Sequence, residues 1–323
     1  MLVEEKQLTE SDGILFASPA EGIGYQSAAA FGRLGKKLLG LVKTPQEQTR
    51  LNALKMLTIM CDWEHLESPE DKIKHPFSTV VISPNAELAN NSALTTEQVT
   101  SMNTLVGVLS RMNPHAHFIF VLPNTTPATL VNDLIRDVRE QATVLLSPAI
   151  FGFRDGALMD QALELAKKNP ALLHKPLTQN FSCALIFAAD IAGFIVSLAQ
   201  NKTQRNTHNK TLYNKIIRVP AAVTNAGDFH QAFCEAFAKA ASLPQKLGAI
   251  FGRNPLEASF QRMSLSAKVP TRTQDEYPPD SEVHALDVFP TQLTPLSKLM
   301  KQSAAQLARH PELELHFPPG RAL

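Results

Sequence analysis

Residues 13–43 read GILFASPAEGIGYQSAAAFGRLGKKLLGLVK, and their pattern is the main basis for predicting the fold class. A short apolar run over 13–18 is followed by a glycine-containing turn, a segment with helical spacing over 25–34 and a second apolar run over 37–42. This order predicts two parallel strands joined by a helix, a βαβ unit. A helix that begins just after such a turn offers unpaired N–H groups and a positive dipole end to a phosphate. The stretch therefore predicts a dinucleotide-binding fold.

The residues that follow repeat this alternation. Four apolar runs predict strands, over 56–61, 77–82, 117–122 and 142–146. The segments between them favour helices, over 44–55, 95–111 and 127–141. Strands that alternate with helices are typical of a parallel sheet with helices on both faces. Ligands bind such sheets at the carboxyl ends of the strands, so we expect a site formed by the turns that follow them.

Beyond residue 150 the alternation becomes irregular. The pattern predicts one strand over 214–219 and four helices, over 158–168, 188–200, 228–243 and 296–308. Asp228 is expected to cap the third of these helices. We therefore expect a core over 1–150 and a smaller lobe over 151–323, with a segment of about 182–243 returning to the core.

Composition narrows the class of protein. Of the 323 residues 44% are hydrophobic, and 31 Lys and Arg face 30 Asp and Glu, a net charge of +1. Because no basic surplus exists, nucleic acid is not an expected partner. Cys61, Cys183 and Cys234 lie far apart in apolar runs. This placement predicts buried free thiols and a reducing compartment. With a polar, acidic start and no run of 18 apolar residues, the sequence predicts a cytoplasmic protein without a membrane segment.

Several segments, taken in order, carry a resemblance to a known family. They are Ser18–Gly24, Cys61-Asp62-Trp63, Val80–Asn85, Met102-Asn103, Ser147–Gly152, Phe187–Leu198 with Asp190, and Pro290–Leu296. Together they resemble the extended short-chain dehydrogenase/reductase family, the group of sugar-nucleotide epimerases and dehydratases. The resemblance implies a Rossmann-like, doubly wound parallel sheet with a smaller C-terminal substrate lobe. It also implies NADP or NAD as the cofactor.

The glycine fingerprint departs from the family's pattern. Its three glycine positions, aligned on Gly24, read Ser18, Glu21 and Gly24. The middle glycine lets the backbone approach the pyrophosphate, whereas a glutamate adds bulk and negative charge there. Gly22 could shift the turn and restore some room, so a working dinucleotide site and an abandoned one are both open.

The family's catalytic pair is absent from the sequence. The family places Tyr-x-x-x-Lys on the helix after the fifth strand, where the lysine lowers the tyrosine pKa and the tyrosine moves a proton. This chain has three tyrosines, Tyr25, Tyr213 and Tyr277, and none is followed by a lysine four residues later. We therefore predict no catalytic residue of the family type.

The resemblance still assigns candidate binding residues. For the cofactor they are Ser18, Glu21, Gly22, Ile23, Gly24, Lys43, Asp62, Trp63, Ser83 and Pro84, and for a substrate or ligand they are Thr125, Arg154 and Asp155. Lys43 could accept an NADP 2′-phosphate or be a solvated lysine. Asp62 could bind the adenine amine or end a strand. His115 and His117 lack a third ligand nearby, so no metal site is predicted.

Three hypotheses follow. The first is a non-catalytic protein that keeps the scaffold and binds a nucleotide, a small ligand or a protein partner. The second is an active NAD(P)-dependent oxidoreductase or epimerase with a rebuilt site. The third is a subunit of a larger assembly, including a homodimer.

Overall fold

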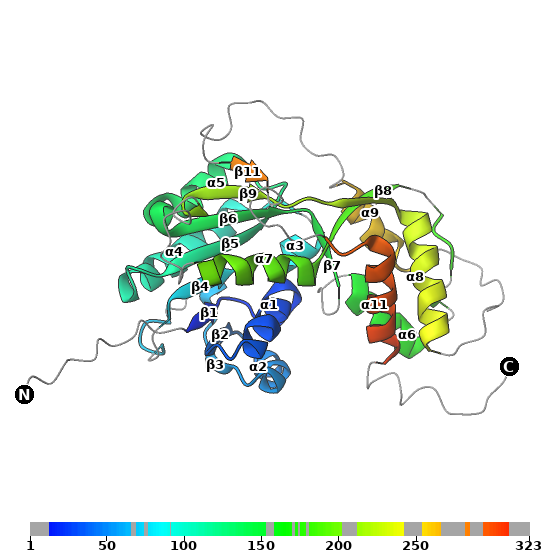
Figure 1. The fold of residues 1–323 in the computed structure, drawn as a ribbon, viewed down its shortest axis with the longest axis horizontal. Helices are drawn as coiled ribbons and strands as arrows, with labels where there is room; N and C mark the ends of the chain where they lie inside the picture. Colours follow the sequence, from blue (N-terminus) through cyan, green and yellow to red (C-terminus); the bar gives the residue numbers. More distant parts are fainter. Residues whose placement is uncertain are drawn as a thin grey trace, which may run out of the picture.

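The computed structural model describes residues 13–65, 69–73, 77–90, 92–152, 158–169, 172–173, 175–178, 181–201, 212–241, 254–265, 282–284 and 293–309. Eight strands in this part of the chain form one sheet with the order β11-β9-β6-β5-β4-β1-β2-β3, and every neighbouring pair is parallel. The strands are β1 (Ile14–Phe16), β2 (Leu38–Val42), β3 (Leu57–Met60), β4 (Thr79–Ile82), β5 (His117–Pro123), β6 (Ala142–Ser147), β9 (Lys215–Arg218) and β11 (Glu282–His284). The predicted doubly wound, Rossmann-like α/β fold is confirmed (Figure 1).

The opening βαβ unit is present. β1 pairs in parallel with β2 through the register Ile14↔Leu38, and α1 (Gly22–Arg33) connects them. The helix begins three residues before the expected start, because Glu21 is already the extended N-cap residue. Gly22 and Gly24 therefore lie in the first turn of the helix and not in the loop before it. β1 also pairs with β4, so the strand order reverses at β1, where this class of sheet opens a crevice.

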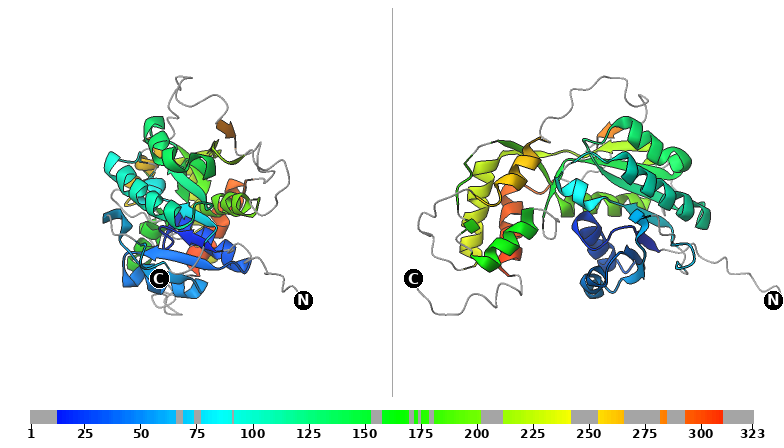
Figure 2. Two further views of the ribbon diagram at one scale, coloured as in Figure 1. Left: turned by 90° about the vertical axis from the view of Figure 1, so that its left-hand side faces the viewer. Right: turned by 180° about the vertical axis from the view of Figure 1, so that it is seen from behind.

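The central strands β1, β2, β4, β5 and β6 are buried along their whole length because helices cover both faces of the sheet. Side chains alternate between the faces: Phe118, Phe120 and Leu122 of β5 join one buried cluster, and Ile119 and Val121 join the other. The first cluster lies under α4 (Thr96–Met112) and α5 (Ala128–Ile135), and the second lies under α1 and α7 (Ala188–Asn201). Figure 2 shows the two helical layers from further sides.

Most predicted helices of the core are confirmed with shifted ends. The segment expected over 44–55 is α2 (Pro45–Leu51) followed by a 3-10 turn, Asn52–Leu54. The segment expected over 127–141 ends as a helix at Ile135 and continues as a 3-10 stretch. The connection after β4 contains α3 (Asn85–Asn90), which was not expected.

A second sheet of three strands was also not expected. It contains β7 (Ala149–Phe151), β8 (Ser182–Phe187) and β10 (Ala222–Asn225) in the order β10-β8-β7. A third buried cluster packs it against α6 (Leu158–Lys168), α8 (Ala226–Ala240), α9 (Glu257–Leu265) and α11 (Leu296–Ala308), at the right of Figure 1. Asn225 caps α8 by accepting the N–H groups of Gly227 and Asp228, so the prediction that Asp228 is the cap was wrong.

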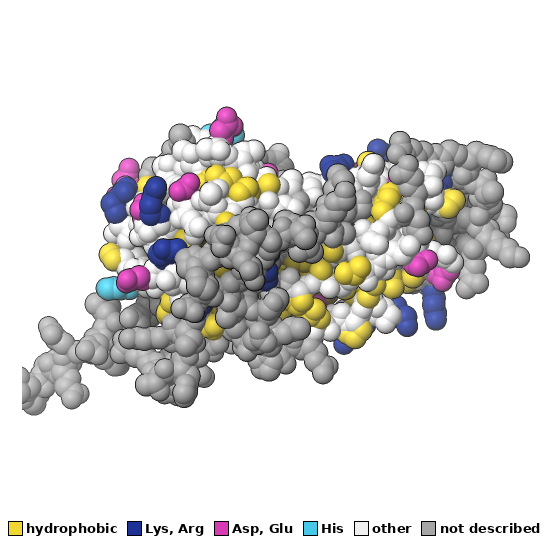
Figure 3. Space-filling model, turned by 90° about the horizontal axis from the view of Figure 1, so that it is seen from above, with side chains coloured by type: hydrophobic (Ala, Val, Ile, Leu, Met, Phe, Trp, Pro, Cys, Tyr) yellow, Lys and Arg dark blue, Asp and Glu magenta, His cyan; other side chains and the backbone are white. Residues whose placement is uncertain are grey.

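Seen from above, Lys and Arg side chains stand beside Asp and Glu at the end of the molecule that holds the larger sheet (Figure 3). None of the helices in the described ranges is long and apolar enough to cross a membrane. Within the same ranges, no three His, Cys, Asp or Glu side chains are grouped so that they could hold a metal ion.

Candidate functional site

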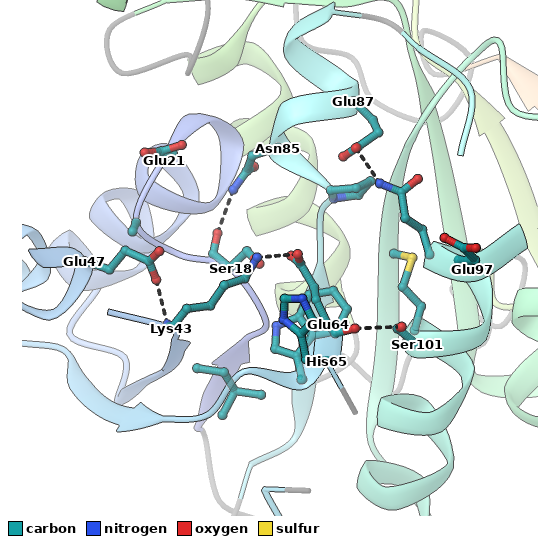
Figure 4. A pocket seen from close by; sticks show the side chains of 16 residues that line it. Ser18, Glu21, Lys43, Glu47, Glu64, His65, Asn85, Glu87, Glu97 and Ser101 are labelled. Atoms are coloured by element: carbon teal, nitrogen blue, oxygen red, sulfur yellow. Dashed lines mark hydrogen bonds and ion pairs between the residues drawn. The ribbon is translucent and has the colours of Figure 1, made fainter. Parts of the chain in front are cut away.

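A cavity of about 400 Å³ opens at the carboxyl ends of the central strands. Its walls come from the β1–α1 turn, the end of β2, the segments after β3 and β4, and the first turns of α4 (Figure 4). The lining residues are Ser18, Ala20, Glu21, Leu41, Lys43, Glu47, Trp63, Glu64, His65, Pro84, Asn85, Glu87, Glu97, Gln98, Ser101 and Met102. The cavity thus lies beside the reversal of strand order, where doubly wound sheets bind their ligands.

The β1–α1 turn packs so tightly that it requires glycine at one position. A Cβ atom on Gly24 would lie 2.3 Å from the Ser18 carbonyl oxygen and 2.9 Å from the Pro19 Cα, both of them backbone atoms. The Asn85 side-chain amide donates to the same Ser18 oxygen over 2.9 Å and ties the turn to the start of α3. Gly24 therefore does what the last glycine of a dinucleotide fingerprint does, which is to allow close packing of helix on strand.

Glu21, at the middle position of the fingerprint, forms an ion pair. The Glu21 carboxylate lies 2.6 Å from the Arg50 guanidinium, which comes from α2. This ion pair joins the N-terminus of α1 to the neighbouring helix at the rim of the cavity. A pyrophosphate approaching the helix N-terminus would meet a carboxylate at a place where the family's pattern has no side chain.

The charge of Lys43 is also engaged. Its ammonium forms an ion pair with Glu64, and this pair crosses the middle of the cavity in Figure 4. Its backbone N–H donates to the Glu47 carboxylate over 2.8 Å. The Ser101 hydroxyl donates to the Glu64 carbonyl over 2.9 Å, which fixes the loop that carries Glu64. Lys43 is therefore placed at the end of β2 as expected, with its charge neutralised by a neighbour.

The segment after β3 forms one wall of the cavity. Trp63 is buried, and its indole N–H donates to the carbonyl of Ala17 at the end of β1. The Asp62 carboxylate lies 2.7 Å from Nδ1 of His65, within the same turn. Asp62 itself is not among the lining residues, whereas His65 is. Trp63, Glu64 and His65 therefore line the cavity, and Asp62 does not.

The structure brings together half of the predicted cofactor residues. Ser18, Glu21, Lys43, Trp63 and Pro84 line the cavity, and Gly22, Gly24 and Asp62 belong to the turns that shape it without lining it.

The other predicted residues lie elsewhere. Ile23 and Ser83 are buried below the surface. Thr125 follows β5 and does not line the cavity. Arg154 and Asp155 lie outside the described residues.

Sequence reasoning missed most of the acidic lining. Glu47 and Glu97 stand in the first turns of α2 and α4, each behind a capping threonine, Thr44 and Thr95. Acidic residues at helix starts are ordinary stabilising features, so no sequence pattern connects these two glutamates. Both helices begin at the carboxyl edge of the sheet, and a search for acids at those helix starts would have found them.

The connection between β5 and β6 lacks the groups that the family uses for proton transfer. The β5–β6 connection, residues 124–141, contains no Tyr, Lys or His. Tyr213 packs against His117 with ring centres 4.7 Å apart, at the amino ends of β9 and β5 and so at the opposite edge of the sheet. Tyr25 lies on α1, and Tyr277 is outside the described residues.

Comparison with known proteins identifies the fold. No protein-family model matches the chain, and no curated protein matches it in sequence. Among solved structures, the yeast methylglyoxal/isovaleraldehyde reductase Gre2, complexed with NADPH, is similar with a TM-score of 0.54 and 8% identity, over 92% of this chain and 98% of that chain. The Bordetella bronchiseptica enzyme WbmH, in complex with NAD⁺, has a TM-score of 0.54 and 10% identity, over 93% and 99%.

A UDP-galactose 4-epimerase is similar with a TM-score of 0.51 and 10% identity, over 92% of this chain and 99% of that chain. Identities this low establish a shared fold and nothing finer. These structural neighbours include reductases and an epimerase, and the chain has the Rossmann-like fold that they share.

Proposed function

We propose that this protein is a non-catalytic relative of the extended short-chain dehydrogenases/reductases that binds a small ligand in the cavity at the carboxyl edge of its sheet. It keeps the scaffold that holds a ligand and has lost the pair of residues that moves protons. A core over 1–150 and a lobe over 151–323, with the segment of about 182–243 returning to the core, are part of this proposal. A protein partner or a second copy of the chain would then bind differently to the ligand-bound and the ligand-free protein.

The composition of the β5–β6 connection carries the proposal. In the family this connection supplies the tyrosine and the lysine, and here it is a short helix and a 3-10 stretch without either residue. Lys43 is the one lysine among the residues that line the cavity, and its ammonium is bound to Glu64. A carbonyl reduction or an epimerisation needs an acid or base within hydrogen-bonding reach of the reacting oxygen.

Turnover assays test this proposal directly. Purified full-length protein is incubated with NADPH or NADH and a panel of aldehydes and ketones, and separately with NAD⁺ and UDP-sugars. We expect no cofactor consumption and no epimerisation above a buffer control, while a purified active reductase of the same fold turns over in parallel. Turnover that rises in proportion to the protein concentration would refute the proposal.

A second function, an NAD(P)-dependent oxidoreductase or epimerase with a rebuilt site, is favoured by one observation. Lys43 stands at the end of β2, where a basic residue can accept an NADP 2′-phosphate, and the neighbour Gre2 was solved with NADPH. Thermal-shift measurements with NAD⁺, NADH, NADP⁺ and NADPH distinguish the two functions. Stabilisation by one cofactor that follows ln(1 + [L]/Kd), together with turnover, would favour the enzyme.

A further inference from the structure

We propose that the cavity binds a small organic cation with several amino groups, of the polyamine class, and selects against phosphorylated ligands. This inference names the ligand class for the proposed function and rests on it. It starts from the cavity itself, which has the size of a small-molecule site and lies where the fold holds ligands.

The charges that line the cavity are unbalanced. Five glutamates and one lysine contribute, which is a formal net charge of −4 with His65 neutral. Arg50 offsets Glu21 and Lys43 offsets Glu64. For Glu47, Glu87 and Glu97 the described residues provide no ion pair; Glu47 accepts a backbone N–H and Glu87 accepts the Gln98 amide. Among the described residues, these three carboxylates therefore have no cationic partner.

These three carboxylates surround the cavity and do not form one exposed row. Glu47 comes from α2, Glu87 from α3 and Glu97 from the first turn of α4, and Figure 4 shows them on different sides of the opening. A flexible chain with amino groups spaced along it can reach several such carboxylates at once. A single compact ion cannot, and no metal-type cluster occurs in the described part of the chain.

The remaining lining suits the apolar stem of such a ligand. Trp63, Leu41 and Met102 also line the cavity, and each is at most 4% exposed, so a ligand would contact a small aromatic and aliphatic part of its wall. An ammonium group close to an indole ring gains further stabilisation from the negative face of the ring. Methylene groups between amino groups would lie against this surface while the charges reach the rim.

The same arrangement disfavours phosphates. Glu21 occupies the N-cap of α1, where a helix would otherwise attract an anion, and Glu64 neutralises Lys43. A dinucleotide would bring its negative charges among carboxylates, and like charges repel.

The full-length protein is titrated with spermidine, and binding is measured by calorimetry and by tryptophan fluorescence. The fluorescence reports on the cavity because Trp63 is the only tryptophan in the chain. We expect saturable binding that weakens as NaCl rises from about 50 to about 300 mM, since the contacts are ionic and partly exposed. The triple variant Glu47→Gln, Glu87→Gln, Glu97→Gln should bind more weakly, by about two- to fivefold for each carboxylate removed.

Glu140→Gln is the matched control, because it makes the same change on the 3-10 stretch that precedes β6, at the opposite edge of the sheet. The control should bind spermidine like the wild type. Circular dichroism and urea unfolding verify that all variants fold. The inference is overturned if spermidine does not bind, or if the control and the triple variant lose affinity equally. It is also overturned if NADPH binds more tightly than spermidine. Turnover of NADPH would instead refute the proposed function.

Discussion

The Asp190 carboxylate accepts two hydrogen bonds from Thr294, one from its backbone N–H over 3.1 Å and one from its hydroxyl over 2.8 Å. The two residues are 104 positions apart in the sequence. They join the first turn of α7, which packs on α1, to the residues just before α11, which packs on α8. This contact therefore joins two segments that carried the family resemblance separately, and it ties α7, which covers the large sheet, to the segment that leads into the third buried cluster.

Replacement of Asp190 should weaken that link. We expect Asp190→Ala to lower the free energy of unfolding by about 1–3 kcal/mol, because hydrogen bonds to a charged acceptor are lost and the Thr294 donors lose their partner. Urea unfolding measures the effect. Thr294→Val removes only the hydroxyl and should cost less. In a double-mutant cycle the two changes should be strongly coupled, and simple additivity would contradict the link.

The tight turn at Gly24 predicts a contrast between two alanine substitutions. Gly24→Ala places a Cβ against the Ser18 carbonyl and the Pro19 Cα, so we expect a loss of about 1–3 kcal/mol or more in unfolding free energy. Gly193→Ala is the control: it lies within α7 with nothing within 4 Å of the added Cβ. It should stabilise the protein by about 0.5–1 kcal/mol, because alanine favours helix over glycine. Equal thermal unfolding midpoints for the two variants would contradict the described turn.

The buried thiols predict a loss of stability at alkaline pH. Burial raises the pKa of Cys183 from 9.0 to about 11 and that of Cys234, with the nearby Glu235 charge adding to it, to about 12. Above pH 9 the unfolded chain releases these protons while the folded chain keeps them, so the unfolded state binds fewer protons and stability falls as pH rises. The expected slope is up to about 1.4 kcal/mol per pH unit for each thiol.

Urea unfolding at pH 8 and pH 10.5 measures this decline. The double variant Cys183→Ala, Cys234→Ala should lose less stability over the same interval, whatever its stability at pH 8. Parallel pH curves for the variant and the wild type would show that other groups cause the decline.

Removal of the two ion pairs at the cavity should increase the affinity for a dinucleotide. The double variant Glu21→Gly, Glu64→Gln removes two carboxylates and frees Arg50 and Lys43 for phosphate. We expect its affinity for NADPH to rise by about two- to thirtyfold over the wild type, since each exposed ion pair is weak. Calorimetry measures the affinities, and Glu140→Gln, which removes one carboxylate away from the cavity, serves as a control. An unchanged or lower affinity would show that these carboxylates do not exclude phosphates.

Much of the core could be predicted because the sequence patterns that indicate its strands and helices lie within short segments. The runs 38–42 and 118–122, which became β2 and most of β5, contain no polar residue, and a strand buried on both faces requires such runs. The helix expected over 95–111 is α4, and Thr95 and Gln98 form a capping box at its start. The short strands β7 and β10 escaped prediction because three or four residues carry too little periodicity, and their pairing with β8 is long-range.

The sequence alone determined the parallel fold and the absence of a Tyr-x-x-x-Lys pair, since hydrophobic periodicity and residue identity are properties of the chain itself. Only the tertiary structure decided the character of the site. Glu47, Glu87 and Glu97 belong to three different helices, and it is the meeting of those helices at one edge of the sheet that makes them the walls of one cavity. Charge at a site depends on distances through space, which a linear pattern does not contain.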